Sequence, residues 1–144
     1  MIYTELTKKA IKLMFEAHKD QKDKSGLPYV FHPFHLAEQM QTEDTTVAAL
    51  LHDVVEDTDY TLQDLREMGF SEAVIAALVL LTHGDDVDYM DYVRAIRGNP
   101  VAKAVKLADL RHNSDLSRLD YIDEKALERQ KKYLNAIAIL EETE

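Results

Sequence analysis

The sequence contains no cysteine, which excludes disulfide bonds, thiolate zinc sites and a cysteine nucleophile. Glycine and proline are scarce, with 4 and 3 occurrences in 144 residues. Because residues that break helices are few and residues that favour them are many, we expect an all-α fold. A chain of this length can bury a substantial core, so we expect a single domain over residues 1–144.

Basic residues are too few for a nonspecific nucleic-acid-binding protein. The 17 Lys and Arg residues are outnumbered by 27 Asp and Glu residues, and the formal net charge is −10. The net charge does not exclude an anionic small-molecule substrate, because a metal ion and a few lysines can reverse the field inside one pocket.

Long apolar runs are also missing, and none approaches the roughly 20 residues of a membrane helix. The first residues, Met1 to Glu5, lack the basic-then-apolar layout of a signal peptide. We therefore expect a soluble cytoplasmic protein without a membrane partner.

Capping residues and apolar periodicity predict a bundle of about eight helices. Thr4 is a candidate N-cap for the first helix, which we expect to run to about Gln21. The second helix is predicted at about 34–40. The third should start within 42–46 and end around 52–58. The later helices are predicted at about 61–68, 72–82, 89–97, from 100 onward, and 124–140.

The segment His52-Asp53-Val54-Val55-Glu56-Asp57-Thr58 concentrates a histidine, three carboxylates and a hydroxyl behind an apolar run. Burying such charge costs several kcal/mol unless each charge has a partner, so this helix end should reach a metal, a substrate or both. On a helix, His52 and Asp53 are neighbours that can reach one ion. Glu56 and Asp57 would lie one turn further, about 5–6 Å away, where they suit the positioning or activation of a water.

Two residues elsewhere in the chain could complete a metal site. His32 precedes Pro33, which suits the first position of a helix, so His32 should lie at a helix cap. Asp109 falls on or beside an apolar helical stripe, where an aspartate is rarely left without a partner. With His52 and Asp53 they would form a mixed nitrogen and oxygen site, suited to Mn²⁺, Fe²⁺, Zn²⁺ or Mg²⁺.

The loop over residues 22–29 is open to two interpretations. Glycine and proline punctuate it, and two lysines and a serine line it. It is either a solvated connector or the lip of an anion-binding site.

Three motifs occur in order: His18-x-x-Gln21-x-x-Lys24-Ser25-Gly26-x-Pro28-Tyr29-x-x-His32-Pro33, then Leu50-Leu51-His52-Asp53-Val54-Val55-Glu56-Asp57-Thr58, then Val105-Lys106-Leu107-Ala108-Asp109 with His112-Asn113. Over about residues 10–120 the chain resembles the hydrolase domain of the RelA/SpoT enzymes, which are HD-domain metal-dependent phosphohydrolases. It is especially similar to the stand-alone small alarmone hydrolases.

The resemblance implies an HD-domain helical bundle with manganese-dependent 3′-pyrophosphohydrolase activity on guanosine tetra- or pentaphosphate. By matched position, the implied metal ligands are His32, His52, Asp53 and Asp109. Glu56 and Asp57 would position and activate the water. The implied contacts to the nucleotide are Lys24, Ser25 and Asn113.

The chain departs from the family pattern at the base-recognition loop. Asp23 stands where the long members often carry an arginine, and Leu27 stands where an acid is common. Leu110-Arg111 also replaces the usual Arg-Leu order. Alternative functions are therefore hydrolysis of another nucleotide or pyrophosphorylated compound, including a nucleoside monophosphate, and non-catalytic nucleotide binding. A purely structural helical protein would leave Asp53 and Asp109 buried without a partner charge.

Overall fold

The computed structural model describes residues 1–142, so the last two residues of the expected domain, 1–144, lie outside the described part. In order, the elements are α1 (Glu5–His18), α2 (Phe31–Glu38), α3 (Glu43–Leu51), α4 (Val54–Asp57), α5 (Leu62–Glu67), α6 (Glu72–Leu81), α7 (Tyr89–Ile96), α8 (Pro100–Asn113), the 3-10 turn η1 (Leu116–Arg118) and α9 (Glu124–Glu141). The expected all-α fold is confirmed. Within the described residues, no helix combines the length and apolarity needed to cross a membrane.

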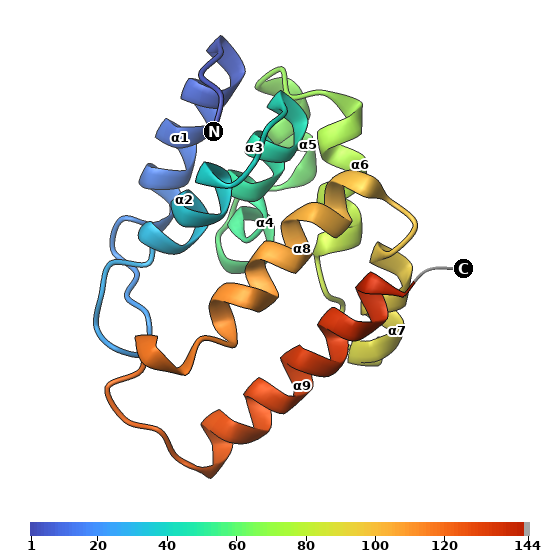
Figure 1. Cartoon of the computed structure of the whole chain (residues 1–144). Coiled ribbons are helices and arrows are strands. Elements are labelled where there is room, and N and C mark those ends of the chain that lie inside the picture. Colours follow the sequence, from blue (N-terminus) through green and yellow to red (C-terminus); the bar gives the residue numbers. More distant parts are fainter. Residues whose placement is uncertain (143–144) are drawn as a thin grey trace.

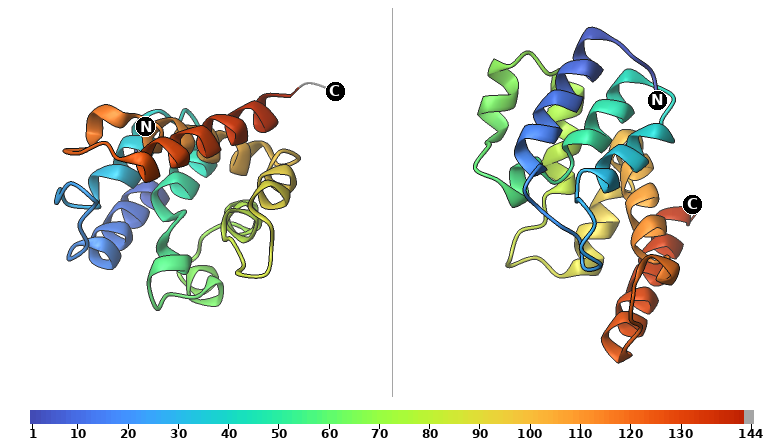
Figure 2. Two further views of the ribbon diagram at one scale, coloured as in Figure 1. Left: turned by 90° about the horizontal axis from the view of Figure 1, so that it is seen from below. Right: turned by 90° about the vertical axis from the view of Figure 1, so that its left-hand side faces the viewer.

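Helix α3 forms the centre of the bundle. It packs against α1, α2, α6 and α8, and its residues from Thr46 to Leu51 are buried on all sides. Helix α8 lies diagonally across the bundle, with α9 beside it (Figure 1). The views in Figure 2 place α9 on the outside of the bundle, where it contacts α7 and α8. The charged end of α3 is therefore held between α2 and α8.

Side-chain caps fix where several helices begin, as the sequence predicts. Thr4 and Thr61 cap α1 and α5 through reciprocal capping boxes, the second of them with Asp64. Ser71 caps α6 through its side-chain oxygen. Gly69, with a φ of +95°, takes the left-handed conformation that follows the end of α5.

The expected third helix does not continue through residues 52–58. Helix α3 ends at Leu51, and Asp53 is the N-cap of the separate one-turn helix α4. The reason is local: Nδ1 of His52 lies 2.7 Å from the Ala49 carbonyl oxygen, which a continuous helix would offer to the next backbone N–H. The Asp57 N–H still bonds to the Asp53 carbonyl at 2.9 Å, so these two residues keep the spacing of one helical turn.

The start of α2 also differs from the prediction. The helix begins at Phe31, so His32 lies in its first turn and the expectation that it occupies the cap is wrong. Pro33 is tolerated at the third position because the first-turn N–H groups have no intrahelical partner. Helix α1 ends at His18, short of the predicted Gln21, whose N–H closes a turn on the His18 carbonyl at 3.0 Å.

Candidate metal centre

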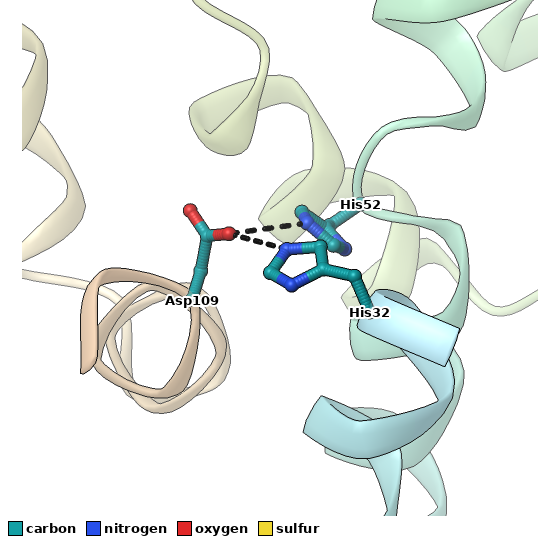
Figure 3. Close-up of side chains that lie close together, drawn as sticks. All are labelled: His32, His52 and Asp109. Carbon is teal, nitrogen blue, oxygen red and sulfur yellow. Dashed lines mark hydrogen bonds and ion pairs between the residues drawn. The ribbon is translucent and has the colours of Figure 1, made fainter. Parts of the chain in front are cut away.

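Three buried side chains from three helices converge at the end of α3. His32 comes from the first turn of α2, His52 follows the last residue of α3, and Asp109 comes from α8 (Figure 3). Each offers one ligand atom, and these atoms all lie within 4.8 Å of one another. Oδ1 of Asp109 lies 2.8 Å from Nε2 of His32 and 3.6 Å from Nε2 of His52. The arrangement has the size and donor types of a metal site.

Asp53, the fourth predicted ligand, lies beside this cluster and does not belong to its three-residue group. Its Oδ2 is 3.1 Å from Nε2 of His52. The same oxygen accepts a hydrogen bond from the Tyr29 hydroxyl. The structure therefore brings His32, His52 and Asp109 together directly, and places Asp53 against His52.

The hydrogen bonding of His52 suits a metal ligand. Nδ1 donates to the Ala49 carbonyl at 2.7 Å, so a neutral ring carries only a lone pair at Nε2. This Nε2 is buried without a hydrogen-bond partner among the described residues, although carboxylate oxygens of Asp53 and Asp109 lie 3.1 and 3.6 Å away. A lone pair facing two negative oxygens is unfavourable, and either a proton or a metal cation between them removes the conflict. The residues present therefore fit a divalent cation.

The pKa values of the metal-free cluster reflect the same need for positive charge. Burial alone would lower the pKa of His52, but Asp53 and Asp109 raise it well above its ordinary value. Burial alone would raise the pKa of Asp53, but His52 lowers it to about 2. Metal binding would therefore displace a proton from His52.

Polar side chains outside the cluster bond to the candidate ligands and orient them. Nζ of Lys106 donates to Oδ2 of Asp109 at 3.0 Å, and Nδ2 of Asn113 donates to its Oδ1 at 3.0 Å. Burial alone would raise the pKa of Asp109, but Lys106 and the two histidines hold it well below its ordinary value. Nδ1 of His32 lies 2.7 Å from Nδ1 of His112. Such outer partners set the direction in which a ligand presents its lone pair.

Glu56 and Asp57 lie on α4, directly after Asp53, and both are exposed. Oε1 of Glu56 accepts a hydrogen bond from the His83 backbone N–H at 3.1 Å. Partial burial raises the pKa of both carboxyl groups, and the nearby charge of Asp53 raises them further. The two predicted water-activating residues thus lie on the single turn of helix that follows Asp53.

A cavity of about 320 Å³ opens beside the cluster and includes His32 and Tyr29 in its wall. All three predicted nucleotide contacts, Lys24, Ser25 and Asn113, line it. Its four cationic and two acidic residues are Lys22, Lys24, Arg118, Arg129, Asp23 and Asp115. An excess of positive charge here, in a chain of net charge −10, favours an anionic ligand.

Asp23 builds the loop that forms one wall of this cavity. Its Oδ1 accepts the backbone N–H groups of Ser25 at 2.9 Å and Leu27 at 3.0 Å. Its Oδ2 lies 3.8 Å from Nη2 of Arg118, and the Ser25 hydroxyl donates to the Arg118 carbonyl at 2.7 Å. The aspartate at this departure from the family pattern is thus a structural part of the loop.

Sequence reasoning assigned no role to Tyr29, Lys106 or His112. Lys106 and His112 lie three residues before and after Asp109, a spacing that places all three on one side of α8. This spacing around a predicted ligand could have identified Lys106 and His112 as its neighbours. Tyr29 carried no comparable signal, because its contact with Asp53 joins the loop before α2 to the N-cap of α4.

Comparisons with known proteins agree with this helical fold. A family model described as "HD domain" matches residues 10–139. The mouse guanosine-3′,5′-bis(diphosphate) 3′-pyrophosphohydrolase MESH1 is 38% identical over 120 residues, covering 72% of this chain and 66% of MESH1. A GTP pyrophosphokinase of Streptomyces coelicolor is 40% identical over 109 residues, covering 67% of this chain and 13% of the relative. The bifunctional (p)ppGpp synthase/hydrolase SpoT of Escherichia coli is 33% identical over 113 residues, covering 68% and 16%.

A solved structure described as a metazoan ortholog of SpoT that hydrolyses ppGpp has the same fold. The TM-score is 0.78 at 23% identity, over 99% of this chain and 89% of that one. The match thus covers nearly the whole helical bundle.

The helical bundle, with its buried histidine and aspartate cluster, is of the HD-domain class. The chain belongs to the HD-domain family, and within it is related to the SpoT/RelA hydrolase domain and to MESH1. It spans only 13–16% of the length of the long relatives named above.

Proposed function

We propose that the protein is a manganese-dependent hydrolase that removes the 3′-pyrophosphate of guanosine 3′,5′-bis(diphosphate). The observation that carries the proposal is a buried His32, His52 and Asp109 cluster beside a cavity with excess positive charge. The cluster suits a divalent cation and the cavity suits a phosphorylated ligand. We infer the particular substrate from the activities after which the relatives MESH1 and SpoT are named.

In this proposal His32, His52, Asp53 and Asp109 hold the metal. Mixed imidazole and carboxylate ligands suit Mn²⁺ and also accept other divalent metals. When bound, the metal polarises the phosphoryl group and lowers the pKa of a water. Lys106 neutralises the outer oxygen of Asp109, and Tyr29 fixes the carboxylate of Asp53.

Glu56 and Asp57 orient the attacking water and accept its proton. Because their pKa values are raised, the two carboxylates are stronger bases than ordinary ones and accept a proton more effectively. The water oxygen forms a bond to the phosphorus attached to the 3′ oxygen, and the bond between that phosphorus and the 3′ oxygen breaks. The proton returns to the 3′ oxygen, and the products are guanosine diphosphate and pyrophosphate.

The cavity beside the cluster receives the nucleotide. Lys24, Ser25 and Asn113 contact it in this proposal, since all three line the cavity. Burial lowers the pKa of Lys24, and the charge of Arg129 lowers it further, so a bound anion would relieve repulsion between two cations.

We also infer a single domain over 1–144 that acts in the cytoplasm.

The test is incubation of metal-stripped protein, reconstituted with Mn²⁺, with guanosine 3′,5′-bis(diphosphate), followed by anion-exchange chromatography. We expect guanosine diphosphate and pyrophosphate from the wild type, and neither from Asp53→Ala. Asp59→Ala removes an exposed carboxylate nearby and should retain activity. Inorganic phosphate as the product would indicate a nucleotidase, and saturable binding without any product would indicate a binding module.

A second candidate function is hydrolysis of a different pyrophosphorylated compound. Asp23 favours it, because this carboxylate places negative charge in the cavity wall and lies 3.8 Å from Arg118. Turnover of another pyrophosphorylated nucleotide by the same preparation, without turnover of the guanosine compound, would support this alternative.

A further inference from the structure

The two imidazoles of His32 and His112 form a direct contact. Their Nδ1 atoms lie 2.7 Å apart, and the ring planes differ by only 6°. At this distance one nitrogen donates a hydrogen and the other accepts it. His112 is therefore bonded to the ring nitrogen that lies opposite the proposed metal-ligating atom of His32.

This contact bears on which ring nitrogen of His32 carries the hydrogen. Its Nε2 points to the cluster, 2.8 Å from Oδ1 of Asp109. When Nε2 gives its lone pair to a cation, the single proton of the neutral ring has to lie on Nδ1. That proton needs an acceptor, and Nδ1 of His112 is the ring atom within reach.

The surroundings of His112 hold its ring in place. It lies in the last turn of α8, three residues after Asp109, so one helix carries both a ligand and the partner of another ligand. The exposed His35 packs on it with ring centroids 4.2 Å apart. The His112 carbonyl accepts a hydrogen bond from Nη1 of Arg118 at 2.9 Å.

We propose that His112 is a positioning residue that accepts a hydrogen bond from the Nδ1–H of His32 and thereby keeps the lone pair of Nε2 available for a metal. The proposal rests on the metal centre of the proposed function. It assigns His112 no contact with substrate. A residue that only packs against His32 would be replaceable by a ring without an acceptor.

Two substitutions separate the acceptor from the ring. His112→Phe keeps an aromatic ring and removes the acceptor. His112→Asn loses the ring but can place its side-chain oxygen where Nδ1 lies. His35→Phe is the matched control, because His35 contacts the same ring without bonding to His32.

The first measurement is Mn²⁺ affinity without nucleotide, by titration with detection of free Mn²⁺ by electron paramagnetic resonance. We expect His112→Phe to weaken binding about 10- to 100-fold, as loss of an outer partner of a metal ligand commonly does. His112→Asn should recover most of this loss, and His35→Phe should match the wild type. Wild-type affinity in His112→Phe, or equal weakening in His112→Asn and His112→Phe, would overturn the proposal.

A second measurement does not depend on how well the variants fold. In the Zn²⁺-loaded wild type, ¹⁵N nuclear magnetic resonance should show the His32 proton on Nδ1 and none on Nε2. A His32 ring without a proton on Nδ1 would overturn the proposal.

The outcomes also separate this inference from the proposed function. Weakened Mn²⁺ binding in His112→Phe, with no pyrophosphate released by the wild type, supports the inference and removes the proposed substrate. Absence of Mn²⁺ binding in the wild type removes both.

Discussion

Lys106 and Asp109 form a buried ion pair in which the two carboxylate oxygens of the aspartate have different partners. Nζ of Lys106 lies 3.0 Å from Oδ2, and the two side chains are only 12% and 9% exposed. The other oxygen, Oδ1, is turned toward His32 at 2.8 Å. Burial alone would lower the pKa of Lys106, but Asp109 raises it above its ordinary value. One carboxylate oxygen is thus neutralised within α8, while the other faces the cluster.

Replacing Lys106 by methionine should destabilise the metal-free protein. The substitution keeps the length of the side chain but leaves Oδ2 of Asp109 buried without its cation, which typically costs about 3–5 kcal/mol. Urea unfolding with a chelator present measures the free energy of unfolding. Lys103→Met, on the same helix, is the control and should change it by less than about 0.5 kcal/mol. A Lys106→Met protein as stable as this control would contradict the account.

Tyr29→Phe should weaken both stability and metal binding. The phenol donates to Oδ2 of Asp53, and loss of a hydrogen bond to a charged group costs about 1.5–3 kcal/mol. The carboxylate would then be free to turn away from His52, so we expect lower Mn²⁺ affinity in calorimetric titration. Tyr133→Phe removes another hydroxyl from the same cavity and should bind Mn²⁺ like the wild type. Equal affinities in all three proteins would refute this role of Tyr29.

The stability of the metal-free protein should fall steeply below pH 4. The pKa of Asp53 is lowered to about 2, from an ordinary value of 3.8, so the unfolded chain binds this proton at a higher pH than the folded one. The stabilisation is complete above pH 3.8 and is lost as the pH falls through 2; it amounts to about 2 kcal/mol. Unfolding measured between pH 5 and 2 should show a smaller change in Asp53→Asn. The same pH dependence in both proteins would show that Asp53 does not contribute in this way.

Asp23 should affect nucleotide binding through its charge and through the loop separately. Asp23→Asn keeps an oxygen for the N–H groups of Ser25 and Leu27 but removes the negative charge near Arg118. We expect this substitution to lower KM for the guanosine substrate by about two- to fivefold and to leave kcat unchanged. The effect on KM is small because the charge that is removed is partly exposed to solvent. Asp23→Ala removes both features and should raise KM. Steady-state kinetics at two salt concentrations checks the charge effect, and a raised KM in Asp23→Asn would be the contrary result.

Local sequence signals predicted most of the fold. Side-chain caps such as Thr4 and Thr61 act within one turn, so their effect can be read from neighbouring residues. The end of α3 could not be read in this way, because an apolar run followed by helix formers continues the pattern past Leu51. The break depends on the His52 side chain taking the Ala49 carbonyl, a choice that periodicity does not reveal.

The candidate site was predictable only in part, because it is assembled across helices. Spacing alone placed His52 beside Asp53, whereas the meeting of α2, α3 and α8 that joins His32 and Asp109 to them depends on tertiary packing. The family resemblance supplied that link. The pairing of His112 with His32 spans 80 residues and followed from neither source.

We expect the end of α3 to hold a divalent metal, and anomalous diffraction from crystals grown with Mn²⁺ would locate that ion. Data collected at the manganese absorption edge should show one strong peak within about 2.5 Å of Nε2 of His32, Nε2 of His52 and Oδ1 of Asp109. A carboxylate oxygen of Asp53 at a similar distance would make it the fourth ligand. Absence of a peak among these residues at saturating Mn²⁺, or a peak only at another place on the molecule, would show that they do not form a metal site.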